Sequence, residues 1–140
     1  MIDLPDTENS PVLRTDYSDD FAWERICEAV RAPADEFRAY VPFLSDPKYQ
    51  GLSAAQVAEF LPADFSQSFI FIVDDTTVHH PDHPVLVLDL NEDRGRTFRV
   101  IPAEVWSVWN NLSIANMDFS EFADNAQADG IFRGFSGAAG

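Results

Sequence analysis

The stretch Phe69-Ile70-Phe71-Ile72-Val73, followed at once by Asp74-Asp75, decides the fold of this chain. Five apolar residues in a row leave no polar alternation, so neither face of a strand built from them can lie in water. A strand that is covered on both faces needs helices above and below its sheet. The sequence therefore predicts an α/β fold, tending to α+β, with this run as the central strand.

The composition predicts one acidic domain. The chain has 140 residues and a formal net charge of -15 at pH 7, which disfavours nucleic acid or an anionic membrane as a direct partner and favours a basic protein. The same acidity can also simply keep a small protein soluble. One cysteine, Cys27, and an N-terminus without signal-peptide features predict a cytoplasmic protein. We expect a loose arm over 1–10, one globular domain over 11–136 and a frayed end over 137–140.

The first half of the chain predicts two strands and two helices before the central strand. Residues 12–15 form the first strand, and 36–44 alternate as the second, which Pro42 places at a sheet edge or ends early. The two helices are predicted from their capping and stop residues. These residues are Ser18 and Pro33 for the first helix, and Ser53, Gln56 and Pro62 for the second.

The second half predicts a hairpin and two more helices. The segment 76–84 is too short for a crossover helix, so a strand over 85–90 should be antiparallel to the central one and return over 96–101. The result is a mixed five-stranded sheet with about four helices, in the order β-α-β-α-β-β-β-α-α, whose first three strands are parallel. The residues that define the remaining elements are Pro102 and Asn116 for a third helix, Asp118 and Glu121 for a fourth, and Phe132 and Phe135 for a docked tail.

Several segments resemble one known family. They are 13–19, 37–41, 83–90, 98–102 and 111–119, and they span nearly the whole chain. On these residues the chain resembles an uncharacterised bacterial family, encountered mainly in actinomycetes, that is known as a domain of unknown function. The resemblance implies a cytoplasmic single domain, and it brings no activity and no catalytic residues.

Carboxylates follow the three strands that are predicted to be parallel. Asp16, Asp46 and the pair Asp74 and Asp75 fall just past their carboxyl ends, the edge where open α/β sheets place ligands. Such carboxylates can hold Mg²⁺, with Asp16, Asp74 and Asp75 as its ligands. The alternative is that each acid caps a turn or the next helix. We expect no cofactor, with Mg²⁺ as the alternative.

The histidines gather in one segment. His79, His80 and His83 lie beside an aspartate, and imidazoles are common transition-metal ligands, but their spacing fits no known zinc motif. An exposed polar loop is the simpler interpretation. Cys27 lies in a helical apolar stripe and should be unreactive.

Arginines cluster on the predicted hairpin. Arg94, Arg96 and Arg99 should pair with Glu92, Asp93 and neighbouring acids as a solvated surface, and an anion site is the alternative. No serine or cysteine nucleophile signature accompanies these residues in the sequence.

The last two predicted helices offer a candidate partner surface. Residues 103–129 contain five acids and no Lys or Arg, and Trp106 falls off the apolar stripe of its helix. An aromatic side chain beside uncompensated carboxylates suits a basic partner, although Trp106 can equally pack under Phe132 or Phe135. Asparagine amides nearby can bind a partner or end the helix. The candidate residues are Glu104, Trp106, Asn110, Asn111, Asn116, Asp118 and Glu121.

Three functions remain open from the sequence. The first is a non-enzymatic binding module that neutralises or escorts a basic protein, as an immunity protein or antitoxin does. The second is a Mg²⁺-dependent enzyme that uses the carboxylates at the sheet edge. The third is a nucleic-acid mimic whose carboxylates imitate phosphates. Which partner it has, whether it catalyses a reaction and its oligomeric state are not encoded in any motif.

Overall fold

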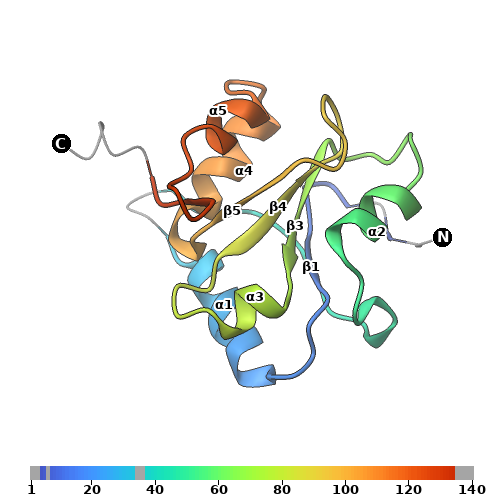
Figure 1. Cartoon of the computed structure of the whole chain (residues 1–140), viewed down its shortest axis with the longest axis vertical. Helices are drawn as coiled ribbons and strands as arrows, with labels where there is room; N and C mark the ends of the chain where they lie inside the picture. The colour runs from blue at the N-terminus through green and yellow to red at the C-terminus, as the bar shows by residue number, and fades with distance from the viewer. Residues whose placement is uncertain (1–3, 6, 34–36, 135–140) are drawn as a thin grey trace.

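The computed structural model describes residues 4–5, 7–33 and 37–134, and within them the chain forms one six-stranded sheet flanked by helices (Figure 1). The strand order is β2-β1-β3-β4-β5-β6. The strands are β1 (Val12–Arg14), β2 (Phe43–Leu44), β3 (Phe69–Val73), β4 (Val85–Asp89), β5 (Thr97–Val100) and β6 (Ile131–Phe132). The helices are α1 (Asp20–Arg31), η1 (Pro47–Tyr49), α2 (Ala54–Phe60), α3 (Asp75–His79), η2 (Pro102–Glu104), α4 (Val105–Ser113) and α5 (Phe119–Ala123), with η marking a 3-10 helix.

The sheet is mixed, as predicted. β1 is parallel to both β2 and β3, whereas β3, β4 and β5 run antiparallel in sequence. A sixth strand, β6, was not predicted from the sequence and lies parallel to β5 at the far edge of the sheet. Phe132 on this strand is fully buried, so the tail docks there, and Phe135 lies outside the described residues.

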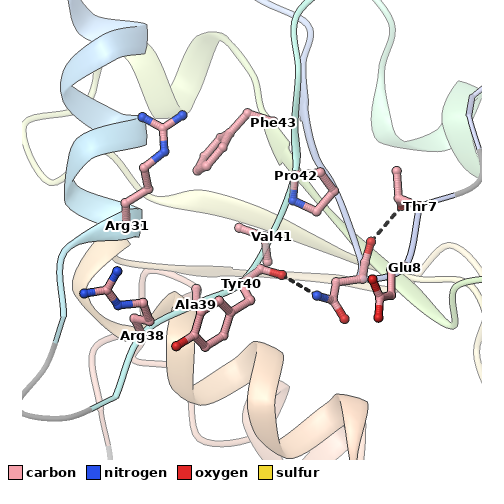
Figure 2. A pocket seen from close by; sticks show the side chains of 10 residues that line it. Thr7, Glu8, Arg31, Arg38, Ala39, Tyr40, Val41, Pro42 and Phe43 are labelled. Carbon is pink, nitrogen blue, oxygen red and sulfur yellow. Dashed lines mark hydrogen bonds between the residues drawn. The ribbon is translucent and has the colours of Figure 1, made fainter.

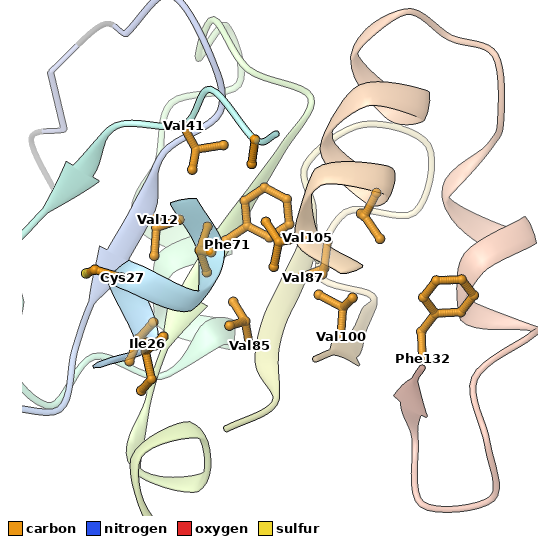
Figure 3. Packing of buried hydrophobic residues seen from close by; sticks show 14 of the residues in the cluster. Val12, Ile26, Cys27, Val41, Phe71, Val85, Val87, Val100, Val105 and Phe132 are labelled. Atoms are coloured by element: carbon orange, nitrogen blue, oxygen red, sulfur yellow. The ribbon is translucent and has the colours of Figure 1, made fainter. Parts of the chain in front are cut away.

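The central strand is buried on both faces, which confirms the interpretation of the apolar run. Phe69, Phe71 and Val73 face a core cluster that includes residues of α1, α4 and α5 (Figure 3). Ile70 and Ile72 face a second cluster, which includes residues of α2. β4 divides in the same way, with Val85 and Val87 on the first face and Leu86 and Leu88 on the second. Helices therefore lie on both sides of the sheet, in the arrangement that Figure 1 shows.

Two helix ends differ from the sequence prediction. Asp19, and not Ser18, caps α1, because its carboxylate accepts the backbone N–H of Ala22. Ser18 instead donates its hydroxyl to Asp16. α4 ends at Ser113, before Asn116, and the residue with a left-handed backbone beyond it is Ala115, at a φ of 55°. The capping boxes of α2 and α5 form as predicted.

Two element assignments were also wrong. The predicted strand over 36–44 is reduced to β2, because Pro42 lacks the N–H that would extend the pairing, and β2 lies at the sheet edge. The segment after β3 contains the short helix α3, which the sequence analysis took for a loop. Asp74 and Thr77 form a capping box that starts α3, and this local signal outweighs the prolines that follow.

The described part of the N-terminal arm contacts the domain. Leu4 is buried in the second core cluster, and the amide of Gln67 donates to the carbonyl of Thr7 at 2.7 Å. The domain boundaries themselves stay a prediction. Among the helices of the described residues, none has the length and apolar character that crossing a membrane requires.

The two-sided core predicts a large penalty for truncating Phe71, which is fully buried and packs edge-on against Phe69 at 5.6 Å between ring centroids. Phe71→Ala should lower the free energy of unfolding by about 3 to 5 kcal/mol, because the cavity adds to the lost burial. Urea denaturation measures this loss. The control is Phe21→Ala, whose ring is 70% exposed and whose removal should change stability by less than about 0.5 kcal/mol. A loss below about 1 kcal/mol for Phe71→Ala would contradict the two-sided core.

Candidate functional site

Asp74, at the carboxyl end of β3, is held by an arginine from β5. The Arg99 guanidinium donates to both carboxylate oxygens, at 3.0 Å from Nη1 and 2.8 Å from Nη2, and also donates to the carbonyl of Pro84. The backbone N–H of Thr77 donates to the same carboxylate. Burial alone would raise the pKa of Asp74, but the hydrogen bonds from Arg99 and Thr77 outweigh it and hold the pKa below its usual value.

Asp16 follows the neighbouring strand β1 and lies beside the polar side chains of Ser18 and His79. Its carboxylate accepts hydrogen bonds from the backbone N–H of Ser18 at 2.8 Å and from the Ser18 hydroxyl at 2.5 Å. Nε2 of His79 lies 3.3 Å from the same hydroxyl and 4.0 Å from Asp16 Oδ2. The serine proton points to the carboxylate, so the imidazole is not placed to remove it as it would be in a nucleophilic triad.

The three candidate Mg²⁺ ligands lie around one pocket of about 430 Å³, which we call the edge pocket. Asp16, Asp74 and Asp75 line it, together with residues that lead into α2. Asp46 lies elsewhere and caps η1. Among the described residues, no group of three or more His, Cys, Asp or Glu side chains is arranged to hold a metal ion.

The three histidines of the 79–83 segment have separate partners. Nδ1 of His80 accepts the backbone N–H of Asp82, and His83 contacts the carbonyl of Thr77 and the guanidinium of Arg25. His79 contacts Ser18 instead, so the three rings do not converge on one point.

The hairpin arginines do not pair with Glu92 and Asp93, which corrects the prediction. Arg94 donates to three backbone carbonyls, those of Ala58, Leu61 and Leu90, and so ties the turn to the end of α2. Arg96 pairs with Asp124 beside α5, and Arg99 with Asp74. Apart from the carbonyl of Leu90, their partners lie far away in sequence, so the three side chains join elements rather than form one solvated cluster.

Buried Cys27 has its pKa raised to about 11, chiefly by burial, which keeps the thiol protonated near neutral pH.

The asparagines organise the end of α4. The amide of Asn111 donates to the carbonyl of Ser107, and the amide of Asn116 donates to Asn111 Oδ1 at 2.8 Å. The carbonyl of Asn111 accepts the backbone N–H groups of Asn116 and Met117. Asn110 accepts the N–H of Ile114 through its own carbonyl. Asn111 and Asn116 thus close the helix with their side chains, as one of the two sequence interpretations proposed.

Four aromatic rings meet beside α4, and we call them the aromatic surface: Trp106 and Trp109 of the helix, and Phe37 and Tyr40 of the segment before β2. Phe37 stacks on Trp106 at 5.0 Å between ring centroids, and Tyr40 meets Trp109 edge-on at 5.7 Å. Phe37 is 49% exposed and Tyr40 is 61% exposed, while both tryptophans are partly buried against the core. Burial raises the pKa of Glu104, and the indole N–H of Trp106 lies near that carboxylate without a hydrogen bond of regular geometry.

A concave site lies at the other end of α4. We call it the acidic pocket: it measures about 290 Å³ and is lined by three carboxylates, those of Asp89, Glu92 and Asp118, and by apolar side chains. No Lys or Arg is among its lining residues. Asp89 is buried and accepts the N–H groups of Asn91 and Asp93, whereas Glu92 and Asp118 are exposed. The apolar lining residues are Phe69, Leu112, Ala115, Met117 and Phe119.

The structure brings together only part of the predicted partner surface. Trp106 lies in the aromatic surface and Asp118 in the acidic pocket, while Glu121 completes the capping box of α5 through the Asp118 N–H. Sequence reasoning missed Phe37 and Tyr40, because their alternating pattern assigned them to a strand. It also missed Asp89 and Glu92, which reach the pocket from β4 and its turn and carry no local signal of that contact.

Comparison with known protein families identifies the family of this chain. A family model described as a domain of unknown function, DUF6924, matches residues 9–135. The chain belongs to this family. No curated protein matches the chain. DUF6924 membership agrees with the resemblance found in the sequence, and the family description assigns no reaction or partner.

The Asp74–Arg99 pair predicts a stability effect that depends on pH. Both side chains are about four-fifths buried, at 21% and 20% exposed, so Arg99→Gln leaves a carboxylate without its charged partner and should cost about 3 kcal/mol at neutral pH. The pKa of Asp74 is lower in the folded protein than in the unfolded chain. Ionised Asp74 therefore stabilises the folded protein above the unfolded pKa of about 3.9, and this stabilisation is lost as pH falls through the pKa of the folded protein. Urea denaturation at several pH values should therefore show the gap between variant and parent closing in acid.

The matched control is Arg96→Gln. Arg96 pairs with Asp124, whose side chain is 69% exposed, so the loss should stay below about 1 kcal/mol. Equal losses for the two variants, or a gap that widens as pH falls, would contradict the role given to the Asp74–Arg99 pair.

Proposed function

We propose that this domain binds a basic segment of another protein, and that a Lys or Arg side chain of that segment enters the acidic pocket. The observation that carries the proposal is the lining of the pocket: three carboxylates beside five apolar residues, with no basic side chain among the lining residues, which also include the polar Ser68, Asn91 and Ser113. A role in neutralising or escorting a basic protein, of the immunity or antitoxin kind, follows from this chemistry together with the net charge of -15.

The pocket suits a long basic side chain better than a metal ion or a free cation. Lys and Arg bury an aliphatic stem against apolar surface while their charged ends stay near acceptors or water. Leu112, Met117 and Phe119 supply the apolar wall, and Glu92 and Asp118 supply exposed carboxylates. Asp89 adds a third negative charge, although two backbone N–H groups already use its oxygens.

The aromatic surface supports the proposal from the other end of α4. Trp106 and Trp109 lie on the same helix as Leu112, which lines the acidic pocket, and three residues of helix rise only about 4.5 Å. Trp and Tyr are, with Arg, the side chains that are enriched among the residues that anchor protein interfaces. A bound segment can therefore place one basic side chain in the pocket and rest apolar groups on Phe37 and Tyr40.

Charge removal tests the pocket without changing its shape. Glu92→Gln with Asp118→Asn should weaken binding of a labelled peptide of about ten residues, half of them lysine, by about tenfold near 20 mM salt. Asparagine can still cap α5, so the fold should be retained. Fluorescence anisotropy measures the affinity, and a melting curve checks the fold.

The control for this prediction is Glu24→Gln with Glu28→Gln, which removes two charges from the exposed side of α1. These two substitutions should weaken peptide binding by less than about threefold, because distant exposed charges are screened. Equal weakening by both pairs would mean that the peptide senses only overall charge, and it would overturn the pocket as the binding site.

A second proposal, Mg²⁺ binding, is favoured by one observation: all three candidate carboxylates line the edge pocket. Arg99 already occupies both oxygens of Asp74, which leaves Asp16 and Asp75 as the available ligands. Mg²⁺ commonly uses one or two protein carboxylates and keeps several waters.

Melting separates this second proposal from the first. If Mg²⁺ binds in the edge pocket, a concentration about a hundred times the dissociation constant should add roughly 2.7 kcal/mol of stability. Asp75→Asn should abolish that gain, whereas Glu59→Gln, an exposed acid of α2, should keep it. A melting curve that does not change at about 5 mM Mg²⁺ would reject the site.

A further inference from the structure

Two arginines stand apart from the other basic side chains of this acidic protein. Within the described residues, five basic side chains form ion pairs with aspartates: Arg14, Lys48, Arg96, Arg99 and Arg133. Arg94 binds backbone carbonyls, and Arg25 contacts His83 and Phe21. Arg31 and Arg38 pair with no carboxylate of the described chain, although the sequence contains 24 acidic residues.

These two arginines line the same pocket, which we call the arginine pocket. It measures about 620 Å³, within the range of small-molecule sites, and lies between the end of α1, the segment that leads into β2, and residues 7–9. Figure 2 shows Arg31 and Arg38 on the α1 side, with Glu8 on the opposite side. The Arg31 guanidinium carbon lies 4.5 Å from the centroid of the Phe43 ring, a contact that restricts the side chain.

The opposite wall is fixed by hydrogen bonds. The amide of Asn9 donates to the carbonyl of Tyr40 at 2.7 Å, and the hydroxyl of Thr7 donates to the carbonyl of Asn9 at 2.7 Å. The Tyr40 ring, 61% exposed, also lines the pocket. The site therefore offers two guanidinium groups and two aromatic rings, those of Tyr40 and Phe43, on a braced backbone.

We propose that the arginine pocket binds a small aromatic monocarboxylate. Guanidinium groups bind carboxylates through paired, charge-assisted hydrogen bonds, and a flat ring can pack against Tyr40 or Phe43. Among the lining residues the formal charge is +1, from Arg31 and Arg38 against Glu8, which matches one negative charge on the ligand. The net charge of -15 on the whole chain repels polyanions, so a monoanion is favoured over a phosphate-rich ligand.

The test uses 2-naphthoate as the probe and follows backbone amide resonances of the ¹⁵N-labelled protein. Saturable shifts should appear at residues 7–9, 38–41 and 43, which line the pocket and, unlike Pro42, have a backbone N–H. The neutral amide of the same ring system should bind at least about tenfold more weakly, because it loses the charge-assisted hydrogen bonds. Phenyl phosphate, a dianion at neutral pH, should bind more weakly than naphthoate.

Variants assign the binding to the two arginines. Arg31→Gln and Arg38→Gln should each weaken the binding of naphthoate by about tenfold or more. Arg25→Gln removes the same charge from the exposed side of α1, outside the pocket, and should change affinity by less than about twofold. Both pocket arginines are exposed, so the variants should fold, and melting curves check this.

Three results would overturn the inference: no saturable shift up to about 10 mM naphthoate, equal binding of the neutral amide, or equal weakening by Arg25→Gln. The Glu92→Gln and Asp118→Asn double variant should bind naphthoate as the parent does, since its changes lie in the acidic pocket. The two proposals share Tyr40, and this double variant separates them because it removes charge only from the acidic pocket.

Discussion

Burial of both faces of β3 and β4 is the constraint on which the rest of the structure depends. Their side chains alternate between two separate core clusters, so each face needs its own cover. α1, α4 and α5 contribute to the cover of one face, and α2 with the segment around Tyr49 contributes to that of the other. The sheet combines parallel pairs among β2, β1 and β3 with antiparallel pairs among β3, β4 and β5, and β6 adds a parallel pair at the far edge.

The same constraint decides where charge can remain available. At the carboxyl edge of the parallel strands, the acids are largely used by the fold: Asp74 caps α3 and holds Arg99, and Asp16 binds Ser18. Carboxylates beside apolar side chains, with no Lys or Arg in the lining, are found instead at the end of α4, around the acidic pocket. Arginines that pair with no described carboxylate gather near the end of α1. Recognition of ligands is thus best supported away from the edge that the fold class would suggest.

Most features set by neighbouring residues could be predicted from the sequence, although the capping box of α3 was missed, and features set by distant contacts could not be predicted. The central strand and the capping boxes at Ser53 and Asp118 depend on residues within a few positions of each other. β6 is only two residues long and gains its identity by pairing with β5, about thirty positions earlier, so it leaves no periodic signal. The acidic pocket could not be predicted for the same reason, since Asp89 and Asp118 come to line one pocket only after the chain has folded. Trp106 was identified from its position off the helical stripe, whereas its contact with Phe37 required the structure.

The two edges of the sheet are formed by β2 and β6, and each strand is only two residues long. Such an edge presents too few free backbone groups to template a strand from another molecule, and Pro42, immediately before β2, removes one more donor. The apolar run that organises the core is the kind of segment that stacks into fibrils when it is exposed. The run lies two strands away from one edge and three from the other, so we expect amyloid-like growth of this protein to require prior unfolding of the domain.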